Sequence, residues 1–198
     1  MEKQVKPNNT AINTRKLTTM GILAGLSVVL VFLIRFPIFP QAPFLEYDPA
    51  DVPILIGTFA FGPVAGFTIT VIASIVQGFT VSAHSGLYGI LMHVISTGSY
   101  VLTAGIIYRI VHNRLGAGIA LLCGVIVSAA VMAAANLLIT PLFMGVPVEA
   151  VKSMLLPVII PFNLIKSGIN GVVTFLLYKP ISNFIKKRST RTPRARVL

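Results

Sequence analysis

The chain has 198 residues, of which 55% are hydrophobic and only 11% are charged, and its mean hydropathy is +0.88. A soluble domain carries roughly 25% charged residues, so this composition excludes an ordinary soluble protein and indicates a polytopic membrane protein. The formal net charge is +11, but the basic residues stand at the chain ends and between apolar segments, which argues against a nucleic-acid-binding surface. At roughly 20 residues a span, the length predicts an all-α integral membrane bundle of six transmembrane helices.

The start of the chain is polar and then becomes apolar for one membrane-spanning length. We predict a cytoplasmic N-terminal tail at residues 1–16, a six-helix membrane domain at 17–186 and a basic cytoplasmic tail at 187–198. The first apolar segment, Leu17 to about Arg35, is long enough to span and lacks a small-x-small cleavage site. It therefore predicts a transmembrane helix and not a cleaved signal peptide.

Small residues form a strip on this first helix. Gly21 and Gly25 are four residues apart and Ser27 follows, a spacing that lets another helix approach closely. The strip has two interpretations, packing inside this protein or docking to a separate membrane subunit, and the spacing leaves both open.

A proline-rich segment follows the first helix. Residues 36–43 contain three prolines within seven positions, so this stretch cannot be helical. Non-helical backbone near a membrane is tolerated only where protein or water covers it. Because the segment and its continuation carry Phe36, Phe39, Phe44 and Leu45, we expect a lid loop over a cavity.

Three of the five acidic residues, Glu46, Asp48 and Asp51, lie within six positions directly before the next apolar segment. Either aspartate could cap a helix N-terminus. We prefer Asp51, because Pro53 then falls at the second helical position, where proline is tolerated. The segment Val52–Phe61 is short for a span, so we expect it to tilt or to start below the surface.

Further apolar segments complete the six predicted helices, and Gly62-Pro63 predicts a tight reversal between the second and the third. The helices are expected at 64–79, 86–111, 115–141 and 157–185, with loops or breaks at 80–85, 112–114 and 144–156.

The distribution of basic residues predicts the orientation. With the N-terminus inside, thirteen of the sixteen Lys and Arg residues lie on the cytoplasmic side, and the loops at 36–50 and 144–157 lie outside. The thirteen are Lys3, Lys6, Arg15, Lys16, Arg109, Arg114, Lys179, Lys186, Lys187, Arg188, Arg191, Arg194 and Arg196. Both termini are therefore predicted to be cytoplasmic in a prokaryotic-type plasma membrane, and the acidic loop extracellular.

Polar side chains inside the predicted spans mark a candidate site. Lys166 lies roughly 12 Å below a helix start near residue 158, and Asn163 shares its face three residues earlier. Asn136 lies at a similar depth on the fifth span. Amide and ammonium groups at one level below an apolar loop favour a pocket for a flat ligand with polar edges. Snorkelling of Lys166 to the outer surface remains the alternative.

Other polar residues give weaker signals. His93 is interpreted either as a pocket residue or as a helix-packing donor, and His84 lies in a loop. No His, Cys or Asp cluster has metal-ligand spacing, and no nucleophile motif is present, so we expect neither a metal site nor an enzyme. The single Cys123 lies in an apolar run and is expected to pack there. Because the chain has no Walker A sequence, any use of ATP must belong to a partner.

Three segments together resemble a known family. They are Asp51-Val-Pro-Ile-Leu-Ile56, Phe61-Gly-Pro-Val-Ala-Gly66 and Ile160-Pro-Phe-Asn-Leu-Ile-Lys166. With six spans in about 190 residues, the chain is similar to the riboflavin-type substrate-binding subunits (S components, RibU-like) of energy-coupling factor (ECF) transporters. The likeness covers nearly the whole hydrophobic region. One departure is that the third helix lacks the Lys-Asn pair of the family pattern and reads Ile72-Ala-Ser-Ile-Val-Gln77.

The resemblance implies a six-helix fold with a vitamin bound near the outer surface, beneath the loop that follows the first helix. It also implies an ECF transmembrane scaffold subunit and two cytoplasmic ATPase subunits as partners, with docking through Gly21, Ala24 and Gly25. Flavin contacts carry over to Asn136, Asn163 and Lys166. The full set of predicted ligand-binding residues is Asn136, Asn163, Lys166, His93, Leu45 and Asp51.

The leading hypothesis is therefore a membrane subunit that captures riboflavin and needs no cofactor of its own. FMN or a different flat vitamin is the alternative ligand. A solitary transporter or channel is the alternative function, but it usually shows an internal repeat or a continuous polar path, and the sequence shows neither.

Overall fold

The structure, a computed structural model, describes the backbone of residues 9–189. These residues form α1 (Asn9–Leu33), β1 (Phe36–Pro37), β2 (Glu46–Tyr47), α2 (Asp51–Phe61), α3 (Pro63–Phe79), the short 3-10 turn η1 (Ala83–Ser85), α4 (Gly86–Ile110), α5 (Arg114–Met144), α6 (Val148–Met154), the π-turn η2 (Leu155–Ile159) and α7 (Ile160–Ser189).

The predicted all-α bundle of six helices is confirmed, in the form of α1, α2, α3, α4, α5 and α7. Helices satisfy every backbone hydrogen bond within one segment, which is why apolar segments fold this way in lipid. Among the described residues, four helical stretches are long and apolar enough to cross a membrane. Helices α2 and α3, with 11 and 17 residues, are shorter. The shortness predicted for the second helix is thus observed.

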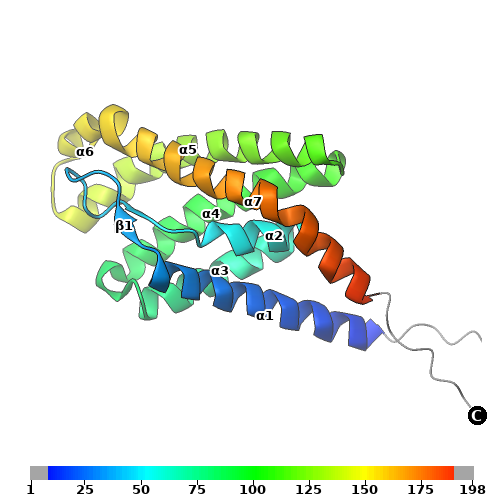
Figure 1. The fold of residues 1–198 in the computed structure, drawn as a ribbon. Helices are drawn as coiled ribbons and strands as arrows, with labels where there is room; N and C mark the ends of the chain where they lie inside the picture. The colour runs from blue at the N-terminus through cyan, green and yellow to red at the C-terminus, as the bar shows by residue number, and fades with distance from the viewer. Residues whose placement is uncertain (1–8, 190–198) are drawn as a thin grey trace, which may run out of the picture.

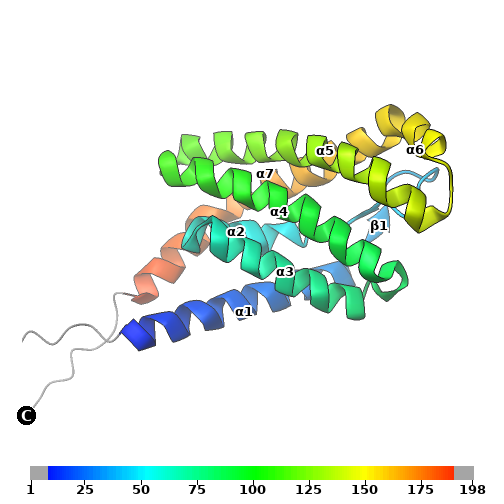
Figure 2. The same cartoon turned by 180° about the vertical axis from the view of Figure 1, so that it is seen from behind.

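The bundle has two distinct ends. The beginning of α1 and the end of α7 lie at one end, and β1 and α6 lie at the other (Figure 1). The view from behind shows α3, α4 and α5 side by side, with α2 enclosed (Figure 2). Helix α2 is buried from Asp51 to Phe59. The hydrophobic core forms around it, and includes Ile54 and Leu55 of α2, Ile69 of α3 and Tyr100 of α4.

The turn between α2 and α3 depends on a glycine. Gly62 has φ 94°, a left-handed conformation that residues with a Cβ atom rarely adopt, and Pro63 then begins α3. The predicted reversal at Gly62-Pro63 is therefore confirmed.

The proline-rich segment is not helical, as predicted. β1 and β2 pair antiparallel, with Phe36 opposite Tyr47 and Pro37 opposite Glu46. We call residues 34–50 the cover segment. It leaves α1 at the end of the bundle that carries α6 and returns to start α2 (Figure 1).

Three helix boundaries differ from the prediction. Helix α1 already begins at Asn9, inside the segment assigned to a tail. The loop predicted at 144–156 contains α6, which continues through η2 into α7, so the last helical stretch begins ten residues before the expected start near residue 158. Residues 190–198 of the predicted basic tail lie outside the described residues.

The third difference concerns the start of α2. The N-cap position is Ala50 and no side chain caps the helix, so the predicted capping role of Asp51 is wrong. Asp51 is the first helical residue, which places Pro53 third and not second. Asp48 is the residue that binds the local backbone, because its Oδ1 accepts a 3.0 Å hydrogen bond from the Ala50 amide. The side chain of Asp51 is free for the tertiary contacts described next.

Candidate functional site

A cavity of about 170 Å³ lies among α3, α4, α5, α7 and the cover segment. Its polar lining residues are Arg35, Glu46, Asp48, Ser74, Gln77, Ser82, Ser85, His93, Ser96, Asn136, Thr140, Asn163 and Lys166. Its apolar lining includes Phe44, Leu45, Tyr88, Ile90, Met92, Met132, Ile139, Phe143 and Phe162. A concave site with a large apolar surface and a few convergent polar groups is typical of small-molecule binding.

The cover segment closes one side of this cavity. Phe44 and Leu45 line it, and Leu45 is buried in a cluster with Val158 and Phe162. Because this cluster joins the cover segment to η2 and α7, the covering residues are held by apolar packing. The cover segment therefore lies where the sequence predicted a lid loop.

Five of the six predicted ligand-binding residues line the cavity: Asn136, Asn163, Lys166, His93 and Leu45. Asp51 does not. It is 2% exposed and is not among the lining residues, so its predicted ligand contact is not supported by the geometry.

The two asparagines present oxygen atoms to their surroundings. Asn163 Nδ2 donates to the carbonyl of Ile159 and Asn136 Nδ2 donates to the carbonyl of Met132, each at 2.8 Å. Thr140 donates to Asn136 Oδ1, also at 2.8 Å. A carboxamide oxygen accepts two hydrogen bonds, so both side chains keep acceptor capacity for a third group.

Lys166 is held by a carboxylate of the cover segment. Its Nζ lies 2.7 Å from Asp48 Oδ2, and the two side chains are 14% and 12% exposed. An ammonium group inside a span is costly unless it is paired, and Asp48 supplies the pairing. Burial favours the neutral carboxyl of Asp48, but the positive charge of Lys166, the nearby His93 and the hydrogen bonds from Lys166 and the Ala50 amide together outweigh burial and hold the pKa of Asp48 below its ordinary value. Lys166 therefore reaches the cavity as one half of an ion pair.

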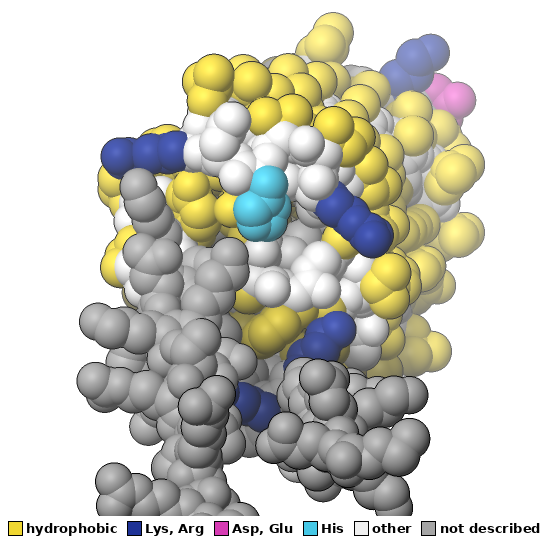
Figure 3. Space-filling model, turned by 90° about the vertical axis from the view of Figure 1, so that its right-hand side faces the viewer, with side chains coloured by type: hydrophobic (Ala, Val, Ile, Leu, Met, Phe, Trp, Pro, Cys, Tyr) yellow, Lys and Arg dark blue, Asp and Glu magenta, His cyan; other side chains and the backbone are white. Residues whose placement is uncertain are grey.

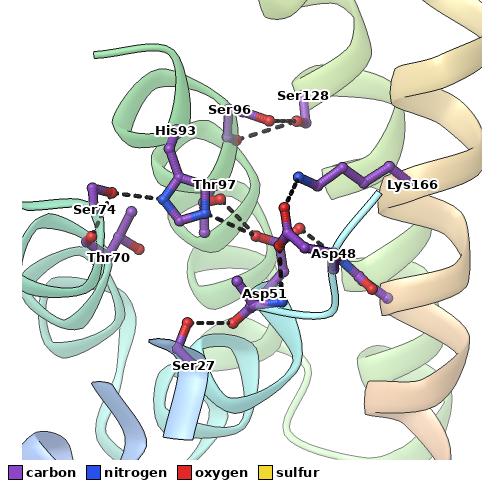
Figure 4. A network of polar contacts seen from close by, with 12 residues as sticks. Ser27, Asp48, Asp51, Thr70, Ser74, His93, Ser96, Thr97, Ser128 and Lys166 are labelled. Carbon is purple, nitrogen blue, oxygen red and sulfur yellow. Dashed lines mark hydrogen bonds and ion pairs between the residues drawn. The ribbon is translucent and has the colours of Figure 1, made fainter. Parts of the chain in front are cut away.

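Asp51 organises a polar network directly beneath this pair (Figure 4). Its Oδ1 accepts from Thr97 of α4 at 2.6 Å and its Oδ2 accepts from Asn170 of α7 at 2.9 Å. His93 Nε2 lies 3.9 Å from the same carboxylate. Asn170 also donates to the backbone carbonyl of Asp48 at 3.0 Å. The start of α2 is thereby joined to α4 and α7.

His93 combines the two interpretations that the sequence left open. It lines the cavity, and its Nδ1 lies 2.7 Å from Ser74 Oγ of α3, which itself donates to the carbonyl of Thr70 (Figure 4). His93 therefore bridges α4 to α3 while facing the site. His84 does not line the cavity and lies 3.1 Å from Arg35.

Arg35 joins three segments at the rim of the cavity. Its Nε donates to Glu46 of β2 at 2.6 Å, and its Nη2 contacts the same carboxylate. Its Nη1 donates to the carbonyl of Val81 in the α3–α4 loop. The residues directly after α1, strand β2 and that loop are therefore held together by one guanidinium.

The sequence reasoning did not predict Arg35, Glu46, Asp48, Gln77 or Asn170 at this site. Asn170 had a visible signal, because it follows Lys166 by four residues and Asn163 by seven, which places all three on one helix face. The pairing of Asp48 with Lys166 had none, because the two residues are 118 positions apart.

The predicted docking residues lie on α1 in two environments. Gly21 and Gly25 are exposed, and a Cβ atom at either position would meet no other atom within 4 Å. Ala24 is 4% exposed and belongs to the core. The two glycines therefore face outward, and they are not used for packing inside this chain.

Known proteins are similar to this chain in sequence and in fold. Residues 15–178 match the family of ECF transporter substrate-specific components. The chain is 31% identical to a protein of Staphylococcus aureus named riboflavin transporter RibU, over 87% of this chain and 93% of that protein. It is 27% identical to the riboflavin transporter FmnP of Bacillus subtilis, over 89% of this chain and 97% of that protein.

A solved structure agrees. The structure described as the S component of a bacterial ECF transporter superposes with a TM-score of 0.74 at 30% identity, and covers 88% of this chain and 99% of that one. The chain therefore belongs to the substrate-specific components of energy-coupling factor transporters.

Proposed function

We propose that this chain is the membrane subunit that captures riboflavin for uptake by an ATPase-driven ECF complex. The observation that carries the proposal is the convergence of Asn136, Asn163 and Lys166 on a cavity beneath an apolar cover, in a chain that resembles named riboflavin transporters over most of its length. A ligand there is enclosed on its apolar faces and contacted at its polar edge, as a flat heterocycle requires.

The hydrogen-bonding polarity of the asparagines supports a flavin ring. Each Nδ2 uses one of its two N–H groups on a carbonyl of its own helix, so Asn136 and Asn163 can each offer Oδ1 and a second N–H to a ligand. Neighbouring acceptors and donors suit a ligand edge that carries both an N–H donor and carbonyl groups. The isoalloxazine ring has such a donor, the imide N–H between two carbonyl groups, and the carbonyl groups suit the ammonium of Lys166.

Riboflavin is favoured over FMN by the charges at the cavity. Both Lys or Arg side chains that line it are already paired, Arg35 with Glu46 and Lys166 with Asp48. A phosphate group would meet two carboxylates and would have to displace one of them to gain a cation. We therefore expect FMN to compete weakly with riboflavin in a binding assay. FMN that displaced riboflavin at equal concentration would contradict this assignment of the ligand.

Delivery of the ligand is proposed to require a scaffold subunit and two ATPase subunits, as in the family. The outward-facing Gly21 and Gly25 support docking of the scaffold on α1, because a helix face formed by glycines lets another helix approach closely. Ala24 lies beneath this surface and keeps α1 packed on the core.

The orientation is proposed from charge. Basic side chains gather around a histidine on the end of the bundle where α1 begins and α7 ends (Figure 3). We assign this end to the cytoplasm and the cavity end, with the cover segment, to the outside. Both termini are then cytoplasmic.

Uptake of labelled riboflavin tests the proposal. Bacteria that cannot synthesise or import riboflavin should accumulate it when they express this chain together with an ECF scaffold and its ATPases. Omission of the ATPases should abolish accumulation. Undiminished uptake by the chain alone would instead support a solitary transporter.

A further inference from the structure

Gln77 is a buried polar residue of the cavity wall that the ligand assignment above leaves without a role. It belongs to α3, its side chain is 5% exposed, and it lines the cavity. Its Nε2 is buried and finds no hydrogen-bond partner among the described residues. A buried donor without a partner costs roughly 1–3 kcal/mol, so such a group is expected to have a partner in the functional state.

The surroundings of Gln77 differ from those of the asparagines. Ser74 lies three residues earlier on the same face of α3, and Ser82 and Ser85 of the following loop also line the cavity. This region, which we call the α3 wall, consists of small hydroxyl side chains and one free amide donor. The α5–α7 wall, with Asn136 and Asn163, instead offers amide oxygens beside apolar rings.

The two walls suit two different parts of one ligand. Acceptor oxygens beside Phe44 and Phe162 fit a flat ring with an N–H edge. A free amide donor among serines fits a chain of hydroxyl groups, because each hydroxyl can accept from Gln77 and exchange further hydrogen bonds with serine.

We propose that Gln77 is a specificity-determining residue that donates from Nε2 to a hydroxyl oxygen on the polyol chain of the ligand, which in riboflavin is the ribityl group. The inference rests on the proposed function. It adds a second polar contact surface, on α3, that distinguishes a flavin with a polyol chain from the same ring without one.

The test compares two ligands against one substitution. Gln77→Met keeps the length of the side chain and removes the donor. The protein, purified in detergent, is titrated with riboflavin and with lumiflavin, which has the same ring and a methyl group in place of the ribityl chain. Thr68→Val serves as the matched control, because Thr68 lies on the same helix, is exposed and does not line the cavity.

We expect Gln77→Met to weaken riboflavin binding about tenfold, the effect of one lost hydrogen bond to a buried group. Lumiflavin binding should stay within about twofold of wild type, since the ring makes no use of this donor. Thr68→Val should leave both affinities unchanged.

Three results overturn the proposal. Equal losses of affinity for riboflavin and lumiflavin show that Gln77 shapes the cavity and does not contact the polyol chain of the ligand. Unchanged riboflavin binding in a folded Gln77→Met protein shows that its donor is not used. Wild-type protein that binds neither flavin removes this inference together with the proposed function, whereas the first two results leave riboflavin capture intact.

If Gln77→Met fails to fold, Gln77→Glu provides the second variant. It keeps the shape and replaces the donor with an acceptor, so the same selective loss of riboflavin binding is expected. An unchanged ratio of riboflavin to lumiflavin affinity in this variant also overturns the proposal.

Discussion

Lys166 of α7 and Asp48 of the cover segment form an ion pair with 2.7 Å between Nζ and Oδ2, at the edge of the cavity. The pair joins the segment that covers the site to the helix that supplies Asn163. A ligand that reaches Lys166 must therefore share it with Asp48.

This pair predicts non-additive effects of substitution. Lys166→Met leaves the Asp48 carboxylate without its partner, and Asp48→Asn leaves the ammonium without its partner, so each should lower the stability by about 1.5–3 kcal/mol. The double variant Asp48→Asn/Lys166→Met should lose less than the sum, because no lone charge remains. Thermal unfolding in detergent, with Lys152→Met as control, measures the difference. Additive losses would show that the two groups do not interact.

The network around Asp51 predicts a larger loss. Asp51 is 2% exposed and accepts from Thr97 and Asn170, so Asp51→Ala should cost roughly 2–6 kcal/mol by leaving two buried donors unpaired. Thr97→Val removes only one donor and should cost about 1–3 kcal/mol. The unfolding midpoints of these variants test whether Asp51→Ala lowers the stability more than Thr97→Val, with Glu149→Gln at an exposed position as the control. A silent Asp51→Ala would contradict the structural role assigned to this carboxylate.

Asp51 also shows where local rules stopped predicting the structure. An aspartate before a helix with a nearby proline favours an N-cap from sequence alone, but Thr97 and Asn170 supply stronger tertiary partners. Those partners lie 46 and 119 positions away, and no local pattern relates them. By contrast, the order of the helices was predictable, because apolar segments in lipid must satisfy their backbone internally.

The end of α5 gives a second example. Gly145 and Pro147 with charged residues after them favour a loop, and Gly145 does adopt φ 66° beyond the end of α5. Helix α6 nevertheless forms beyond Pro147, with Val151 buried in the cluster that holds the cover segment. A stretch of seven residues with Val151 as its one buried residue is too short to give a clear periodic signal for this helix.

The glycine strip predicts a separation of binding from transport. A leucine side chain introduced by Gly21→Leu or Gly25→Leu would point into open space, so riboflavin binding by the isolated chain should stay unchanged. Uptake through the ECF complex should be lost, because the added side chain keeps the scaffold helix from approaching closely. Gly168→Leu is the matched control, because its Cβ also meets open space but on α7. Uptake that survives both α1 substitutions would exclude this strip as the docking surface.

The orientation predicts which cysteines an impermeant reagent reaches from outside intact cells. In a Cys123→Ala background, Ala150→Cys on α6 should be labelled from outside, whereas His112→Cys between α4 and α5 should be labelled only after the cells are opened. Both residues are exposed, so access depends on the side of the membrane. The opposite labelling pattern would invert the proposed topology.

The most direct test of the account is a titration of riboflavin fluorescence with the purified chain and with Asn163→Leu. The central claim is that riboflavin binds in the cavity between α3, α4, α5 and α7, with the amide oxygen of Asn163 at its polar edge. The wild-type chain should quench the fluorescence saturably. Asn163→Leu should weaken binding by about one to two orders of magnitude, because the N–H edge of the ligand loses its acceptor. The absence of saturable quenching by the wild-type chain, or an Asn163→Leu affinity within about threefold of wild type, would contradict the account.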